Sequence, residues 1–260
     1  VNTQTYIPPI LGQQGEDCDF KTLVKRQLEE GTDIEIGQVL DYELALYDTQ
    51  RPALVGLGQE FITSARLDNL LSCFVGLQAL LETKSDTGAL LVCNDHEEVG
   101  SITASGARGP MLTQMLERLV PAPEDRNRAL SHSMLISVDN AHGVHPNFAD
   151  RHDDNHGPLL NHGPVIKFNT NQRYATNSET AAVFRRLAAD EEVPCQTFVA
   201  RSDVACGSTI GPLAAAEMGV RTVDVGVPQW AMHSVRELVG AADAFNLSRV
   251  LRRFFNTVEL

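Results

Sequence analysis

Two adjacent glutamates follow an apolar run in the middle of the chain. Glu97 and Glu98 lie in the segment D-H-E-E-V-G-S at 95–101, directly after the run A-L-L-V-C at 89–93. Such a run is typical of a buried strand, and the ligand sites of α/β proteins lie beyond the carboxyl ends of strands. Carboxylates in that place suit metal-assisted hydrolysis, in which one holds an ion and another moves a proton. The simpler alternative is an acidic, solvated loop.

Three more residues of metal-binding type have similar settings. Asp139 follows the strand-like run 134–138, His233 lies beyond the run 222–226, and Asp68 lies in the first turn of a predicted helix. Carboxylates and imidazole without thiolate suit Zn²⁺ held for catalysis, with Mn²⁺ or Co²⁺ as replacements. Taken singly, each residue has a structural explanation, such as a helix cap, a turn or a buried histidine. Their shared position favours a common metal site.

The apolar pattern predicts the elements that must position these residues. Over 66–82 the three- and four-residue spacing predicts an amphipathic helix that packs on a core through Leu67, Leu70, Leu71, Phe74, Leu77, Leu80 and Leu81. Strands are predicted at 35–49, 89–93, 134–138, 164–169, 196–200 and 222–226, and further helices at 110–120, 178–190, 209–218 and 244–256. The alternation predicts an α/β fold: a doubly wound, mostly parallel sheet with helices on both faces. A domain boundary is expected near residues 50–58, where proline and glycine punctuate the chain.

Composition excludes several classes of protein. The 260 residues include 34 acidic and 21 basic side chains, and the net charge of −13 argues against a nucleic-acid or anionic-membrane partner. No apolar run is long enough for a membrane span, and the first residues lack a signal-peptide layout, so a cytoplasmic location is expected. The five cysteines are scattered without a C-x-x-C pair, which disfavours a disulfide framework or a thiolate zinc site.

Taken in order, six motifs resemble the aspartyl aminopeptidase family. They are R-L-D-N at 66–69, D-H-E-E-V-G-S at 95–101, D-N-A-H-G-V-H-P-N at 139–147, G-P-V-I-K-F-N at 163–169, C-G-S-T-I-G-P at 206–212 and M-H-S-V-R-E at 232–237. The resemblance covers essentially the whole chain. It implies a metallopeptidase-like α/β domain interrupted by an inserted dimerisation domain. Residues 1–58 are then expected to be the tail of the inserted domain, and 59–260 the catalytic domain without its N-terminal side.

The resemblance also implies a reaction and a division of roles. The family removes N-terminal Asp or Glu from peptides with two metal ions, here expected to be two Zn²⁺ per complete active site. By position, Asp68 would bridge the ions, Glu98 would bind one, Asp139 the other, and His233 would complete a shell. Glu97 would be the general base.

Substrate contacts and partners follow from the same resemblance. Lys167 would bind the acidic side chain of the substrate, and His142 would donate a hydrogen bond to the developing oxyanion. Tyr174, Gly207 and Ser208 are expected to line the substrate site. The expected partners are peptides with an acidic N-terminal residue and further copies of the chain in a homo-oligomer.

The chain departs from the family pattern in one respect. A His-x-Asp motif expected upstream, which would supply an imidazole ligand, has no counterpart, because the first 67 residues contain no histidine. One ion would then have an incomplete shell, so a fragment of a longer protein is expected. Three alternatives stay open: a dinuclear aminopeptidase of broader specificity, a non-catalytic assembly subunit and a simple zinc-binding module.

Two further groups of residues suggest chemistry less strongly. One is a histidine-rich stretch that contains His145, His152, His156 and His162. These histidines suggest a second zinc site, but glycine and proline oppose a regular helix there. A polar active-site loop is therefore favoured. Cys206 lacks an evident general base and is interpreted as a buried structural cysteine rather than a nucleophile.

Overall fold

The computed structural model describes residues 2–11 and 19–259, and the chain divides into two compact units, 1–46 and 47–260. The first unit contains the helices α1 (Thr3–Tyr6) and α2 (Phe20–Gly31). The Asp19 carboxylate caps α2 by accepting hydrogen bonds from two backbone N–H groups. The strand predicted over 35–49 is wrong: the segment forms no strand, and its apolar side chains Leu40, Leu44 and Leu46 are exposed. A strand needs a hydrogen-bonding neighbour, and alternation alone does not supply one.

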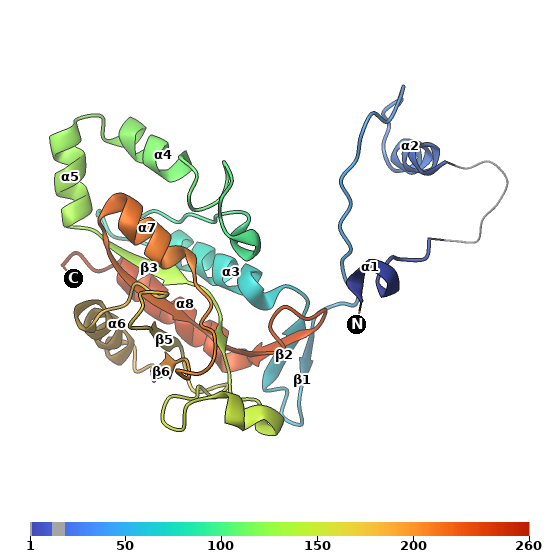
Figure 1. Ribbon diagram of the computed structural model, residues 1–260. Helices are drawn as coiled ribbons and strands as arrows, with labels where there is room; N and C mark the ends of the chain where they lie inside the picture. The colour runs from blue at the N-terminus through green and yellow to red at the C-terminus, as the bar shows by residue number, and fades with distance from the viewer. Residues whose placement is uncertain (1, 12–18, 260) are drawn as a thin grey trace. The chain divides into compact units, whose positions relative to one another are not determined.

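A four-stranded sheet forms the centre of the second unit (Figure 1). Its strands are β3 (Met134–Val138), β7 (Arg221–Gly226), β5 (Val165–Phe168) and β6 (Gln196–Val199), in the spatial order β3-β7-β5-β6. The pairs β3–β7 and β5–β6 are parallel, whereas β5 and β7 run antiparallel. The predicted α/β architecture is confirmed, and the sheet contains one antiparallel junction that the sequence pattern did not indicate.

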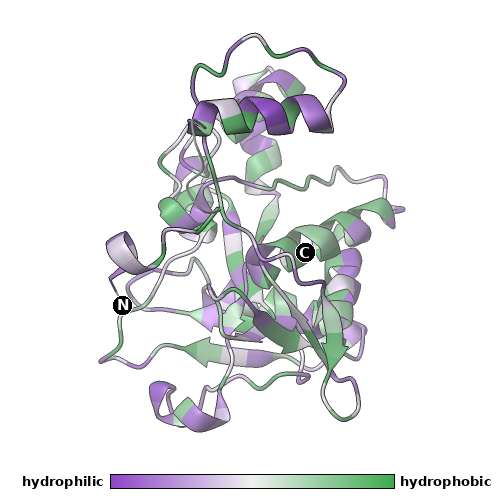
Figure 2. Cartoon of the chain, turned by 90° about the vertical axis from the view of Figure 1, so that its right-hand side faces the viewer, coloured by the Kyte–Doolittle hydropathy of each residue, from purple (hydrophilic) through white to green (hydrophobic). Residues whose placement is uncertain are grey.

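Helices cover both faces of this sheet. Val223 and Val225 of β7 pack with α3 (Leu67–Leu81), α6 (Ser178–Asp190) and α8 (Ala241–Phe255) in the main hydrophobic core. Because side chains alternate along a strand, Asp224 points to the other face, where its carboxylate approaches α7 (Ile210–Met218). Because both faces of the sheet are covered, all the residues of β7 after Arg221 are buried, including Thr222 and Asp224. In Figure 2 the sheet and the adjoining helices carry much of the hydrophobic colouring.

A second, five-stranded sheet has the order β1-β2-β9-β8-β4. Its strands are β1 (Ala53–Val55), β2 (Phe61–Ser64), β9 (Glu237–Gly240), β8 (Pro228–Trp230) and β4 (Ala141–His142). β8 follows β7 after one residue, and β4 follows β3 closely, so the chain passes from the central sheet into the second sheet at two neighbouring points. These points lie at the carboxyl ends of β3 and β7. The two compact units meet between Leu46 and Tyr47, and the domain boundary near 50–58 stays a prediction.

Two predictions for the α3 region need correction. The segment 89–93 forms no strand, so the glutamates do not follow a sheet strand. The helix itself is confirmed, but only one side of its apolar stripe packs on the core, through Leu67, Leu71 and Val75. The opposite side is exposed: Leu70, Phe74, Leu77 and Leu81 are 58%, 61%, 46% and 71% accessible. An apolar stripe this wide exceeds what one packed layer covers.

The remaining helices are α4 (Met111–Leu119) and α5 (Pro123–Ser131). The second was not predicted, because its polar sequence lacks an apolar stripe; Pro123 in its first turn and two acidic residues there were the available signals. Within the described residues, no helix has the length and apolar character needed to cross a bilayer.

Candidate metal centre and active site

Three side chains from distant parts of the chain converge at one point. His233 Nε2 lies 3.2 Å from Asp68 Oδ2 and 3.0 Å from Glu98 Oε2. Among the described residues, these three form the one group whose ligand-type atoms all lie within 4.8 Å of one another. Two carboxylates and one imidazole match the ligands that a catalytic zinc ion takes from proteins. Three of the four predicted metal ligands are therefore brought together.

Local backbone geometry explains how each ligand is presented. Asp68 lies at the start of α3, but its backbone dihedral angles are not helical. Its side chain therefore does not follow the direction of the side chains in the helix. Glu97 and Glu98 begin a short 3-10 helix (Glu97–Val99), in which successive side chains project about 120° apart. His233 adopts a left-handed conformation (φ 63°) in the turn between β8 and β9. The neighbouring glutamates can thus serve different purposes without lying on a strand.

Asp139, the fourth predicted ligand, follows β3 and lies beside Asp68. Burial, together with the charges of Asp139 and Glu98, raises the pKa of Asp68 to about 8. Its Oδ1 atom is buried and accepts no hydrogen bond from any described residue. A buried carboxylate oxygen without a donor is costly, and a bound cation would remove that cost. The residues therefore fit a metal ion.

Glu97 has the protonation behaviour of a general base near neutrality. Burial and the negative charges of Asp139 and Glu98 raise its pKa to about 7, while Lys167 and His233 oppose the rise. A carboxyl group with this pKa exchanges its proton readily at neutral pH. Glu97 is not a member of the converging ligand group. The arrangement separates a proton-accepting carboxylate from a ligand-type carboxylate.

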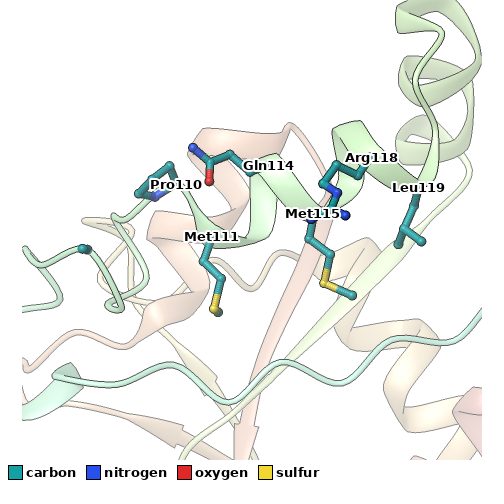
Figure 3. Close-up of a pocket in the computed structure, with 7 residues that line it drawn as sticks. Pro110, Met111, Gln114, Met115, Arg118 and Leu119 are labelled. Atoms are coloured by element: carbon teal, nitrogen blue, oxygen red, sulfur yellow. The ribbon is translucent and has the colours of Figure 1, made fainter.

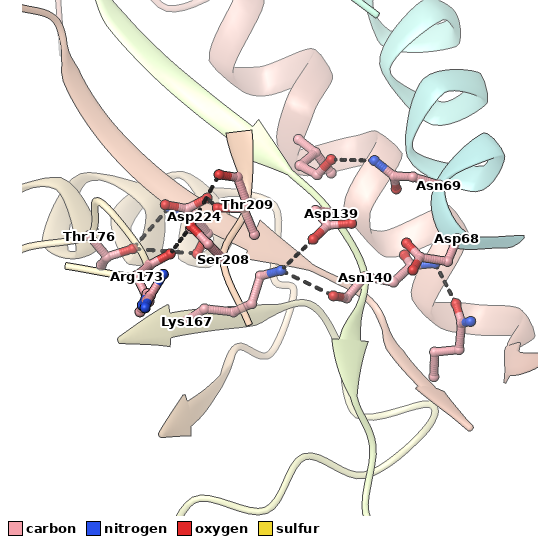
Figure 4. A network of polar contacts seen from close by, with 12 residues as sticks. Asp68, Asn69, Asp139, Asn140, Lys167, Arg173, Thr176, Ser208, Thr209 and Asp224 are labelled. Atoms are coloured by element: carbon pink, nitrogen blue, oxygen red, sulfur yellow. Dashed lines mark hydrogen bonds and ion pairs between the residues drawn. The ribbon is translucent and has the colours of Figure 1, made fainter. Parts of the chain in front are cut away.

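Lys167 supplies a buried positive charge next to the carboxylates (Figure 4). It lies on β5 and is 2% exposed. Its Nζ atom is 3.2 Å from Asp139 Oδ2 and donates to the carbonyl oxygen of Asn140 at 3.0 Å. The same atom lies 5.2 Å from the centre of the Tyr174 ring, within cation–π range. Lys167 is thus held between Asp139 and Tyr174.

The predicted substrate residues differ in how they are connected to this cluster. Burial and the positive charges of Lys167 and His152 lower the pKa of His142, which keeps its ring neutral. Tyr174 is buried beside Lys167, and burial raises its pKa. Ser208 donates to the carbonyl oxygen of Arg173, so it adjoins the Tyr174 loop. Among the described residues, no hydrogen bond or ion pair joins Gly207 to the carboxylates.

Two buried carboxylates that the sequence did not single out connect the loops around this cluster. Asp224 of β7 accepts hydrogen bonds from the Ala175 backbone and the Thr209 hydroxyl, both at 2.6 Å, and so ties two loops together (Figure 4). Glu237 accepts from the backbone N–H groups of Asp68 and His233. An acidic residue inside an apolar strand, as in T-V-D-V-G at 222–226, was the available signal for Asp224.

The histidine-rich stretch shows no shared ligand geometry. His152 Nε2 lies 3.2 Å from the carbonyl oxygen of His142, and His156 Nδ1 lies 2.5 Å from Asp153 Oδ1. Among the described residues, these histidines belong to no group that would hold a metal ion. The interpretation of this stretch as a polar active-site loop stays a prediction.

A surface pocket of about 660 Å³ lies elsewhere (Figure 3). It is lined by residues of α4 and the preceding loop: Ala104, Pro110, Met111, Gln114, Met115, Arg118 and Leu119. None of them is a candidate site residue, and none carries a carboxylate or imidazole. The pocket is separate from the proposed chemistry.

An α/β fold that brings two carboxylates and a histidine together is consistent with a metallopeptidase-like protein. A family model described as "Aminopeptidase I zinc metalloprotease (M18)" matches residues 3–255. The chain therefore belongs to the M18 family of zinc metallopeptidases.

Named relatives and solved structures agree with this membership. The chain is 60% identical to the "Probable M18 family aminopeptidase 2" of Pseudomonas entomophila (strain L48), over 100% of this chain and 61% of that relative. It resembles a chain in the cryo-EM structure of the Ape4 and Nbr1 complex, with 37% identity and a TM-score of 0.81 over 90% of this chain and 47% of that one. It also resembles a chain of the S. cerevesiae mApe1 dodecamer (29% identity, TM-score 0.80, 90% and 54% coverage). The chain thus spans about three fifths of the curated relative.

Proposed function

We propose that this chain carries the metal-binding and proton-transfer groups of an aminopeptidase that removes N-terminal Asp or Glu from peptides. The observation that carries the proposal is the convergence of Asp68, Glu98 and His233 beside Glu97, whose pKa is raised to about 7. Membership of the M18 family supports the general reaction. The acidic specificity rests on Lys167 and on the motifs that resemble aspartyl aminopeptidases.

A complete site would hold two Zn²⁺ ions, with Mn²⁺ or Co²⁺ as possible replacements. Asp68, Glu98 and His233 would hold one ion and leave a fourth position open. Asp68 would also face a second ion that Asp139 binds, since the two carboxylates interact directly. The second ion needs a further ligand, which the described residues of this chain do not place there.

Metal ions held by these residues would activate a water molecule for attack and would polarise the scissile carbonyl. The protein residues supply the remaining functions. Glu97 accepts a proton near neutral pH and returns it to the leaving amine, and its separation from the ligand group leaves it free to do so. His142, whose lowered pKa keeps it neutral, presents an N–H group to the carbonyl oxygen of the substrate.

Specificity for an acidic residue requires a cation among these carboxylates, and Lys167 is placed to provide it. Its Nζ atom pairs with Asp139 in this structure. If Asp139 served as a metal ligand, Lys167 would be available to pair with the carboxylate of the substrate. Tyr174 would form one wall of this subsite, and the segment with Gly207 and Ser208 another, since Ser208 is bonded to the Tyr174 loop.

The Lys167–Asp139 pair also favours a second candidate, a dinuclear aminopeptidase of broader specificity. If the lysine stays bound to Asp139 in the loaded enzyme, it neutralises a ligand and selects no substrate.

Both candidates include assembly into a homo-oligomer, and the similarity to the dodecameric S. cerevesiae mApe1 supports this. Residues 1–58 would then be the tail of an inserted dimerisation domain, and 59–260 the catalytic domain.

Metal analysis combined with substrate comparison tests the proposal. We expect chelator-sensitive zinc binding, with hydrolysis of Asp- and Glu-linked chromogenic substrates well above that of the Leu-linked one. Lys167→Ala should remove this preference and leave bound zinc unchanged. A preference for Asp over Leu that survives in the variant would favour the broader-specificity candidate. Zinc-independent hydrolysis would refute both.

A further inference from the structure

Glu237 connects the two proposed ligands that lie farthest apart in the sequence. It is the first residue of β9 and is 2% exposed. Its Oε2 atom accepts a hydrogen bond from the backbone N–H of Asp68 at 2.9 Å, and its Oε1 atom accepts from the backbone N–H of His233 at 2.8 Å. Each oxygen of one carboxylate therefore holds the main chain of a different ligand.

The backbone of Glu237 is itself fixed on the sheet. Glu237 pairs with Ser64 in the β2–β9 ladder, and its carbonyl oxygen accepts a hydrogen bond from the Thr63 hydroxyl at 2.9 Å. The main chain at both ligands lacks such support from regular structure. Asp68 is non-helical at the start of α3, and His233 is in a left-handed turn with a side chain that is 59% exposed.

Removing the Glu237 carboxylate from water is unfavourable. Among the residues that the structure describes, Glu237 has no ion-pair partner. Its carboxylate accepts hydrogen bonds from two backbone N–H groups. A buried charge without a countercharge costs several kcal/mol. Its negative charge also acts on Asp68, so it adds to the local demand for a cation.

We propose that Glu237 is a positioning residue, which sets the separation of the Asp68 carboxylate and the His233 imidazole and thereby determines zinc affinity. The inference rests on the proposed metal site. Replacing a residue that hydrogen-bonds to a metal ligand and orients it typically lowers metal affinity by about 10–100-fold. In this site the orientation acts through the main chain of the ligands.

Glu237→Gln tests the role directly. The amide keeps one acceptor and places an NH₂ donor against the second backbone N–H, so one of the two ligand segments loses its anchor. We expect zinc affinity, measured by competition with a chromogenic chelator, to fall about 10–100-fold. The visible spectrum of the Co²⁺-substituted protein should also change, because it reports the coordination geometry.

Asp243→Asn is the matched control. Asp243 is also a fully buried carboxylate, and it accepts from two backbone N–H groups, those of Asn161 and Gly163. None of its hydrogen-bond partners is a proposed ligand. The control should lower stability to urea as Glu237→Gln does, yet bind zinc and Co²⁺ as the unmodified protein does.

The outcomes separate the inference from the proposed function. Equal zinc affinity in Glu237→Gln and the unmodified protein, or an equal loss in the Asp243→Asn control, would overturn the positioning role alone. An unmodified protein that binds neither zinc nor Co²⁺ would overturn the metal site and the inference with it. If Glu237→Gln does not fold, Glu237→Asp replaces it. That variant keeps the charge but cannot reach both amides, so its zinc affinity should also fall, and unchanged affinity would refute the role.

Discussion

Lys167 should stabilise the metal-free protein by neutralising buried carboxylates. Its side chain is 2% exposed, and its partner Asp139 is 17% exposed, so the pair is largely removed from water. Lys167→Met keeps the length and apolar stem of the side chain but removes the charge. Breaking a buried ion pair by deleting one partner costs about 3–5 kcal/mol, because the remaining charge is left uncompensated. We expect a loss of this size in the free energy of unfolding at pH 8.

The loss should depend on pH in a defined direction. Lys167 holds down the pKa of Glu97, which is about 7 in the intact protein, so the variant should raise that pKa further. At pH 6 Glu97 carries a proton, fewer negative charges face each other, and the loss in unfolding free energy should be smaller than at pH 8. Urea unfolding at both pH values, in the presence of a chelator, measures this difference.

An exposed lysine provides the control for this prediction. Lys84 lies on the surface, and its hydrogen bond to Asn256 uses the backbone N–H rather than the side chain. Lys84→Met should change the unfolding free energy by less than about 0.5 kcal/mol. Equal losses in the two variants, or a Lys167→Met loss that is the same at pH 6 and pH 8, would refute the electrostatic role assigned to Lys167.

Three further predictions concern the carboxylates of the site. Glu97→Gln should lower kcat by about 10²–10⁴-fold with bound zinc unchanged; steady-state kinetics and metal analysis check this, and near-normal turnover would remove Glu97 as the base. Because the folded pKa of Asp68 (about 8) lies above its ordinary value of 3.8, the metal-free protein should lose stability as pH rises from about 4 to 8. Urea unfolding with chelator should show this slope and unfolding with saturating zinc should not; identical slopes would contradict it. Asp224→Asn leaves one of two donors, Ala175 N–H or the Thr209 hydroxyl, without its acceptor, and should lower the unfolding free energy by about 1–3 kcal/mol. A neutral effect on urea unfolding would show that the two loops are held by other contacts.

Periodicity located the elements whose signals are local. The helix predicted over 178–190 has these bounds in the structure, which also shows a capping box formed by Asn177 and Thr180 at its start. The strand 134–138 was also predicted with its observed bounds. The run 89–93 has an equally apolar sequence and forms no strand, since strand formation depends on a partner that the run itself does not specify.

The chemical types of the site residues were determined by the sequence alone. The order of the motifs and the absence of thiolates indicated a carboxylate–imidazole metal site of a metallopeptidase. The M18 match confirms the broader family, and the aspartyl-specific assignment stays a prediction. Only the tertiary structure decided which side chains meet. Asp68 comes from the start of α3, Glu98 from a short 3-10 helix and His233 from the turn between β8 and β9. A buried carboxylate, Glu237 of β9, joins the first and the third of these segments through hydrogen bonds to the main chain. Residue types follow from the local sequence, whereas distances between residues far apart in the chain follow from how the whole chain packs.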